Sequence, residues 1–106
     1  MQENNQSKGI AILGSTGSVG RSTLDVVERN SDKFHVVALG ARRSVDELLI
    51  QTKKFSPDYV VLTDENAASE FKQKSSQLNS VPELIVGDEG LISIASLPEV
   101  DCVMAA

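Results

Sequence analysis

Three glycines stand where an apolar run of the sequence ends and a helical pattern begins: Gly14, Gly17 and Gly20. A strand that stops at glycines and restarts as a helix leaves backbone N–H groups unpaired at the start of that helix. These donors and the helix dipole both favour a negatively charged ligand such as a phosphate. We therefore expect residues 14–20, the glycine loop, to hold the bridging phosphates of a nucleotide. The expected contacts are Thr16, Gly17, Ser18 and Val19.

Each glycine of the loop has its own expected role. Gly14 lets the chain turn off the strand, Gly17 leaves room for a pyrophosphate, and Gly20 lets the helix pack closely. The spacing is Gly-x-x-Gly-x-x-Gly rather than the commoner Gly-x-Gly-x-x-Gly, but a strand, a helix and a second strand flank it as a dinucleotide motif requires. No Gly-Lys-Ser/Thr follows, which disfavours a mononucleotide P-loop. A structural glycine turn in another α/β protein remains the alternative.

The residues after the second expected strand bear on which dinucleotide is bound. In NAD-binding domains an acidic residue there bonds the ribose hydroxyls. This sequence has Arg42, Arg43 and Ser44 instead. Two guanidinium groups and a hydroxyl are suited to the additional 2′-phosphate of NADP. The sequence therefore predicts NADP over NAD, the alternative being two solvated arginines on a loop.

A sheet must position these two groups of residues. Apolar runs rich in β-branched residues alternate along the chain with segments of helical spacing. Strands are expected at residues 8–13, 35–41, 59–62, 83–86 and 100–106, and helices at about 18–30, 44–55, 64–77 and 88–95. The alternation predicts an α/β fold, a doubly wound, Rossmann-like parallel sheet with right-handed crossovers over residues 8–106. Residues 1–7 are expected to be a disordered tail. Because the chain ends inside an apolar strand, we expect the domain to be incomplete at its C-terminus and part of a longer protein.

Local patterns predict how the helices begin and which residues they bury. Ser44 and Glu47 have the spacing of a capping box, and Asp64 and Asp88 are placed to cap the third and fourth helices. The residues expected on the buried side of the first helix are Val19, Thr23, Val26 and Val27.

Composition restricts the partners and the compartment. A net charge of −5 with scattered basic residues disfavours a nucleic acid or an anionic membrane surface as a partner. Residues 1–7 lack the features of a signal peptide, and no later run approaches membrane-spanning length. The single cysteine, Cys102, falls in an apolar run and is expected to pack in the core in a reducing compartment. A cytoplasmic location is therefore expected.

Other residue types that do chemistry lack partners at a suitable spacing. The only histidine, His35, has no cluster of Cys, Asp or Glu around it at metal-ligand spacing. The hydroxyls of the glycine loop have no His/Asp partners that would make one of them a nucleophile. We therefore expect neither a catalytic nor a metal-binding residue in this chain.

The glycine loop and the arginines belong to stretches that resemble the N-terminal part of the 1-deoxy-D-xylulose 5-phosphate reductoisomerase family. The first, Ile-Leu-Gly-Ser-Thr-Gly-Ser-Val-Gly-Arg-Ser-Thr-Leu-Asp-Val-Val, is longer than any general dinucleotide motif and is specific to that family. The resemblance runs from about Lys8 to the end of the chain. Its matching stretches are residues 12–27, 34–39, 55–59 and 100–106.

The resemblance implies an enzyme of the methylerythritol phosphate route to isoprenoid precursors. It would rearrange a phosphorylated sugar, 1-deoxy-D-xylulose 5-phosphate, and reduce the product with NADPH to 2-C-methyl-D-erythritol 4-phosphate, with Mn or Mg holding the substrate oxygens. It also implies a homodimer. The NADPH contacts that it implies match Thr16, Gly17, Ser18 and Val19 for the phosphates and ribose, and Arg42, Arg43 and Ser44 for the 2′-phosphate.

The chain departs from the family at one of these positions, since the family more often has a glycine where Arg42 stands. The resemblance places the metal-binding carboxylates, the substrate lid and the second domain beyond Ala106. The chain alone is therefore expected to bind NADPH weakly and to catalyse nothing.

Two alternatives remain open from the sequence. One is the cofactor domain of a semialdehyde dehydrogenase, whose glycine turn has the same spacing and which would need a catalytic cysteine further along the chain. The other is a Rossmann module that senses NADP(H) and passes the signal to a partner without chemistry.

Overall fold

The computed structural model describes residues 7–106. The tail expected over residues 1–7 lies outside the described residues, apart from Ser7. The hydroxyl oxygen of Ser7 is 2.7 Å from Nδ1 of His35, and His35 is exposed.

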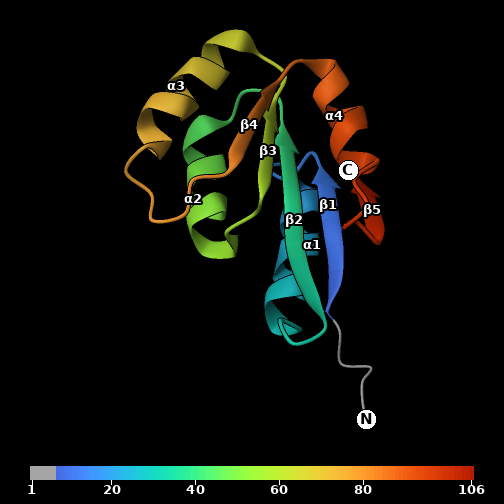
Figure 1. Ribbon diagram of the computed structural model, residues 1–106. Helices are drawn as coiled ribbons and strands as arrows, with labels where there is room; N and C mark the ends of the chain where they lie inside the picture. The colour runs from blue at the N-terminus through green and yellow to red at the C-terminus, as the bar shows by residue number, and fades with distance from the viewer. Residues whose placement is uncertain (1–6) are drawn as a thin grey trace.

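Within residues 7–106 five parallel strands form one sheet in the order β4-β3-β2-β1-β5 (Figure 1). The strands are β1 (Lys8–Leu13), β2 (Phe34–Ala41), β3 (Tyr59–Leu62), β4 (Glu83–Val86) and β5 (Cys102–Ala105). The helices that alternate with them are α1 (Ser18–Arg29), α2 (Val45–Phe55), α3 (Glu65–Ser75) and α4 (Asp88–Ala95). The predicted Rossmann-like α/β fold is confirmed, and the ends of the elements differ from the expected ones by at most two residues.

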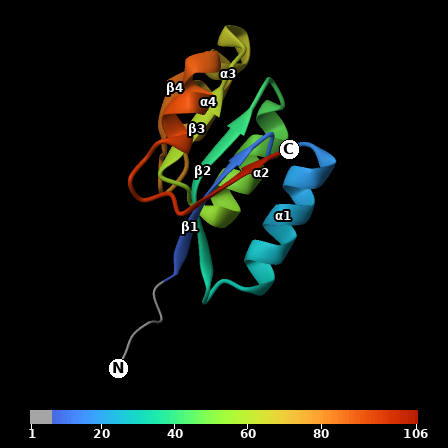
Figure 2. The same cartoon turned by 90° about the vertical axis from the view of Figure 1, so that its right-hand side faces the viewer.

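Helices cover both faces of the sheet, with α1 and α2 on one side and α4 on the other (Figure 2). The strands supply alternate residues to the two faces, because successive side chains of a strand point to opposite sides. Ile10 and Ile12 of β1 pack in the cluster that includes α1, α2 and α3, whereas Ala11 packs in the cluster that includes Ile94 of α4. Burial on both faces explains why the sequence of β1 is apolar without alternation.

The strand order reverses at β1. The chain builds β1 to β4 in one direction and then crosses back to place β5 beside β1. In open α/β sheets ligands bind outside the carboxyl ends of the strands at such a reversal. Leu13, the last residue of β1, is paired with Gly40 of β2, so the glycine loop begins beside the end of β2.

The side of α1 that faces the sheet differs from the expected one. Gly20, Leu24 and Val27 are buried, whereas Val19 and Val26 are each 54% exposed. Residues 20, 24 and 27 are spaced as one helical face, and the apolar residues 19 and 26 lie on the adjacent stripe. The prediction was therefore right for Val27 and wrong for Val19 and Val26.

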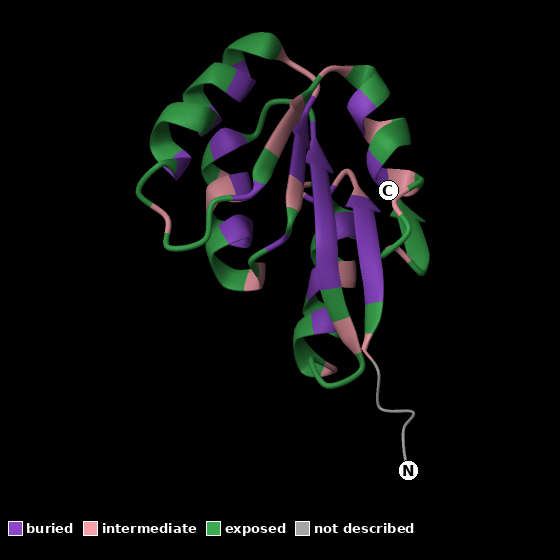
Figure 3. Ribbon diagram, viewed as in Figure 1, coloured by how far each residue is buried: buried purple, intermediate pink, exposed green. Residues whose placement is uncertain are grey.

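The edge strand β5 also differs from its expectation. β1 and β2 are buried along most of their length, whereas all four residues of β5 are exposed (Figure 3). The prediction that Cys102 packs in the core is therefore wrong. An apolar sequence alone does not distinguish a central strand from an edge strand, because the difference depends on what covers the strand. No helix in the described part of the chain is long and apolar enough to cross a membrane.

Candidate functional site

The glycine loop is tied at its start to the end of β2. The backbone N–H groups of Gly14 and Ser15 both donate to the carbonyl oxygen of Gly40, at 2.8 and 2.9 Å. Gly14 has φ +90°, a conformation that residues with a side chain rarely adopt. Gly17 N–H then donates to Gly14 O at 3.2 Å and closes a tight turn. The turn off the strand expected at Gly14 is thus present.

Gly20 and Gly17 are required for different reasons. A Cβ on Gly20 would lie 2.2 Å from Gly14 O and 2.7 Å from Ser15 Cα, so α1 packs directly on the backbone of the loop. A Cβ on Gly17 would meet no atom of residues 7–106 closer than Gly14 O at 3.6 Å, which is ordinary van der Waals contact. The fold therefore needs a glycine at position 20, whereas the space beside Gly17 is free for a ligand.

The loop presents unpaired backbone donors at the carboxyl end of β1. Gly17 is the N-cap of α1, and its carbonyl accepts from Arg21 N–H at 2.9 Å. In the part of the chain that the structure describes, the N–H groups of Thr16, Ser18 and Val19 donate to no backbone carbonyl. Gly17, Ser18 and Val19 are exposed and Thr16 is half-buried, whereas Ser15 is fully buried. The structure thus brings the four predicted residues together on an accessible helix N-terminus, which suits a phosphate.

Arg42 and Arg43, which follow β2, line different hollows. Arg42 lines a hollow of about 350 Å³ that includes Gly14 and Gly40, so it borders the glycine loop. Arg43 and Ser44 line a second hollow together with the acidic residues Asp46, Glu47 and Glu70. All three residues of the 42–44 segment are exposed. Of this segment, Arg42 is the residue that the structure places in the crevice beside the glycine loop.

Several residues that line the hollow beside Arg42 and Gly14 were not predicted from the sequence. Its other lining residues are Ala41, Thr63, Asp88, Leu91 and Ala106. Asp88 was expected to cap α4, but the N-cap is Gly87, and Asp88 makes no capping bond within residues 7–106. By contrast Asp64 does cap α3, accepting from Ala67 N–H at 2.9 Å. The pattern of a capping carboxylate is the same in both cases, so spacing alone does not reveal that Asp88 borders the crevice.

The capping box expected at the start of α2 is wrong. In the described residues the Ser44 side chain makes no capping hydrogen bond. Glu47 instead accepts two hydrogen bonds from the guanidinium of Arg21 on α1, Nε to Oε2 at 2.6 Å and Nη2 to Oε1 at 2.5 Å. A bidentate guanidinium–carboxylate pair is stronger than a bond from a carboxylate to a neutral backbone N–H, which accounts for the change of partner.

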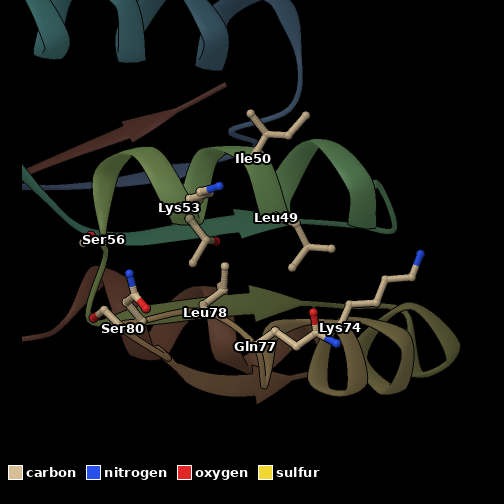
Figure 4. Close-up of a pocket in the computed structure, with 10 residues that line it drawn as sticks. Leu49, Ile50, Lys53, Ser56, Lys74, Gln77, Leu78 and Ser80 are labelled. Atoms are coloured by element: carbon tan, nitrogen blue, oxygen red, sulfur yellow. The ribbon is translucent and has the colours of Figure 1, made fainter.

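A larger hollow lies elsewhere, between α2 and the segment that follows α3 (Figure 4). Its volume is about 600 Å³, and Leu49 and Lys53 of α2 face Leu78 and Lys74 across it. The pKa of Lys74 is raised because Glu70 and Asp46 accept hydrogen bonds from its ammonium group. No residue of the glycine loop or of the 42–44 segment lines this hollow, so it is separate from the candidate site.

The side chains that commonly bind metal ions are dispersed in this structure. Among residues 7–106 no group of three or more His, Cys, Asp or Glu side chains is placed to hold a metal ion. The unpaired N–H groups of the glycine loop, by contrast, suit the phosphates of a nucleotide.

Comparison with known proteins agrees with this geometry. The family model of 1-deoxy-D-xylulose 5-phosphate reductoisomerase matches residues 10–106. Among curated proteins, the reductoisomerase of Saccharophagus degradans is 48% identical over 97 residues, covering 92% of this chain and 25% of the relative. The chloroplastic enzyme of Mentha piperita is 44% identical over 92 residues, covering 87% of this chain and 20% of the relative. The chain thus spans about a quarter of the length of the curated relatives it matches.

Solved structures give the same result. A crystal structure of DOX-P reductoisomerase in complex with magnesium is 34% identical and superposes with a TM-score of 0.87, covering 92% of this chain and 24% of that one. The Zymomonas mobilis enzyme in complex with NADPH is 33% identical and superposes with a TM-score of 0.80. The match covers 89% of this chain and 24% of that one. The chain belongs to the 1-deoxy-D-xylulose 5-phosphate reductoisomerase family.

Proposed function

We propose that this chain is the NADPH-binding part of an enzyme that rearranges 1-deoxy-D-xylulose 5-phosphate and reduces the product to 2-C-methyl-D-erythritol 4-phosphate, in isoprenoid precursor biosynthesis. The observation that carries the proposal is the glycine loop, whose unpaired N–H groups belong to half-buried or exposed residues at the reversal of strand order. A family member from Zymomonas mobilis is known in complex with NADPH. The site in this chain has the donors and the open space that such a ligand needs.

The backbone of the loop is proposed to hold the pyrophosphate. The unpaired N–H groups of Thr16, Ser18 and Val19 lie at the start of α1, where the helix dipole also favours negative charge. Gly17 leaves open the space into which the phosphates come. Gly14 and Gly20 instead fix the path of the loop.

Arg42 is proposed as the main contact of the 2′-phosphate. It borders the same crevice as Gly14 and Gly40, and a guanidinium presents forked donors at full charge. Arg43 and Ser44 are proposed as outer contacts on the other side of the segment, where acidic neighbours weaken the local positive field. NADPH is therefore preferred over NADH.

Bound NADPH supplies the hydride for the reduction. The residues of this chain bind and orient the cofactor, and none of them is proposed to take part in proton transfer or in the rearrangement. We propose that Mg or Mn acts in the complete enzyme through ligands outside residues 7–106, because no suitable cluster lies within them. We further propose that the complete enzyme is a cytoplasmic homodimer and that its substrate is a phosphorylated sugar.

The two alternative functions are less well supported. A semialdehyde dehydrogenase domain shares the glycine spacing, but the family model and the relatives are reductoisomerases. A sensor of NADP(H) would bind the same cofactor, so cofactor binding alone does not separate it from an enzyme part.

Calorimetric titration of the protein with NADPH and with NADH tests the proposal. We expect saturable binding of NADPH and weaker binding of NADH. Failure to bind either cofactor would contradict the proposed function, and equal affinity for the two would contradict the 2′-phosphate assignment.

A further inference from the structure

Gln51 connects α2 to the glycine loop. Its side-chain Nε2 donates to the carbonyl oxygen of Ser15 at 2.9 Å, across 36 positions of sequence. Both residues are inside the protein: Gln51 is 6% exposed and Ser15 is 0% exposed. The hydrogen bond therefore attaches the buried side of the glycine loop to α2.

This contact determines the direction of the next backbone donor. The Ser15 carbonyl and the Thr16 N–H belong to one planar trans peptide unit, in which C=O and N–H point in opposite directions. A carbonyl held toward Gln51 therefore aims the Thr16 N–H away from α2. That N–H has no backbone acceptor among residues 7–106 and is one of the donors assigned to the phosphates.

We propose that Gln51 is a positioning residue, which orders the glycine loop for pyrophosphate binding by holding the Ser15–Thr16 peptide in this orientation. The inference rests on the proposed function, because it concerns the affinity of the loop for the diphosphate of NADPH. Ordering the loop in advance raises affinity, since less freedom is lost when the ligand binds.

The buried polar atoms around the contact support a role beyond stability. Within the described residues, Oε1 of Gln51 and Oγ of Ser15 are buried and have no hydrogen-bond partner. Buried polar atoms are usually paired, and an unpaired one costs stability. An apolar residue in this position of α2 would avoid that cost, as Leu48 does one turn earlier, fully buried. Stability of the core therefore does not explain a glutamine here, whereas a hydrogen bond to the loop does.

The orientation of the Gln51 amide is set by a second contact. Nε2 lies 3.4 Å from Oε2 of Glu47, which also accepts from Arg21 on α1. A carboxylate on one side and a carbonyl on the other both require the nitrogen of the amide, not its oxygen. Through Glu47 and Gln51, α2 is linked to α1 and to the glycine loop, the two elements that carry the phosphate donors.

The test compares Gln51→Met with a matched variant of the next residue, Thr52→Val. Methionine keeps the length and apolar volume of the side chain and removes the donor. Thr52 is 1% exposed, and its hydroxyl donates to Leu48 O within α2, so Thr52→Val removes a buried hydrogen bond of the same helix without touching the loop. The probes are NADPH and adenosine 2′-monophosphate, which has the 2′-phosphate but no pyrophosphate.

We expect Gln51→Met to weaken NADPH binding by about fivefold, the factor that corresponds to one hydrogen bond of ordinary net strength. Binding of adenosine 2′-monophosphate should not change, and Thr52→Val should change neither affinity. If Gln51→Met does not fold, Gln51→Asn replaces it, because it keeps the amide but withdraws it by one methylene group, and the same weakening of NADPH binding is expected.

Unchanged NADPH affinity in a folded Gln51 variant would overturn the inference and leave the proposed function standing. Equal loss for both probes would also overturn it, because it would show general damage to the site. If the unsubstituted protein binds no NADPH, the proposed function itself fails, which is a distinct result.

Discussion

Gly20 lies so close to Gly14 that a Cβ on Gly20 would be 2.2 Å from the Gly14 carbonyl oxygen. This contact sets the first turn of α1 directly on the glycine loop. Gly17, three residues earlier, has no such restriction. One substitution, glycine to alanine, is therefore expected to have opposite consequences at the two positions.

Gly20→Ala should destabilise the protein by at least about 2 kcal/mol, because the new methyl group overlaps backbone atoms that cannot move independently of the loop. The free energy of unfolding in urea measures this. Wild-type stability of the variant would show that α1 does not pack on the loop as described.

Gly17→Ala should leave the fold intact and reduce NADPH affinity by about tenfold, or about 1.4 kcal/mol. Gly17 has φ −80° and ψ 173°, which alanine adopts without strain. Stability should change little, because the reduced freedom of the unfolded chain is offset by the poorer fit of alanine to the N-cap position of α1. Calorimetric titration and urea unfolding of the same preparation measure both effects. Unchanged NADPH affinity would indicate that no phosphate approaches Gly17.

Arg42→Ala should weaken NADPH binding by about tenfold or more, the cost of losing a hydrogen bond to a charged group, and leave NADH binding unchanged. Arg43→Ala should have a smaller effect, because its hollow is lined by Asp46, Glu47 and Glu70 rather than by the glycine loop. Arg29→Ala is the matched control, since it removes an exposed arginine whose partner is Asp25 on α1. The ratio of NADPH to NADH affinity is the readout, and a larger change for Arg43→Ala than for Arg42→Ala would reverse the assignment.

The Arg21–Glu47 pair should contribute a coupling free energy of up to about 1 kcal/mol, because the pair is bidentate but partly exposed. A double-mutant cycle of Arg21→Ala and Glu47→Ala measures this coupling free energy, with urea unfolding giving the stability of each variant. The single-contact pair of Arg29 and Asp25 should give about 0.3 kcal/mol in the same experiment. Coupling should decrease at high salt. No coupling between Arg21 and Glu47 would argue against the described link between α1 and α2.

The fold and the turn at the glycine loop could be predicted from the sequence. Apolar runs and helical spacing predicted the order of the strands and helices, because local pattern dominates those features. The glycine loop was predictable since its glycines stand between a strand and a helix. Asp64 acts as the expected cap for the same local reason.

Features that depend on distant partners were not predictable. Glu47 pairs with Arg21 across two helices instead of closing a capping box. Cys102 is exposed because β5 lies at the edge of the sheet, which its apolar sequence does not reveal. In the sequence, Gln51 is one polar residue of an amphipathic helix. Its contact with Ser15 arises only from the packing of α2 in the fold.

The most direct test of the central claim is a ¹H–¹⁵N NMR titration of the protein with NADPH. We predict that the largest amide shifts fall on Thr16, Gly17, Ser18, Val19 and Arg42. Shifts confined to the hollow between α2 and the segment after α3, or no shifts at saturating NADPH, would contradict the claim that the glycine loop is the cofactor site.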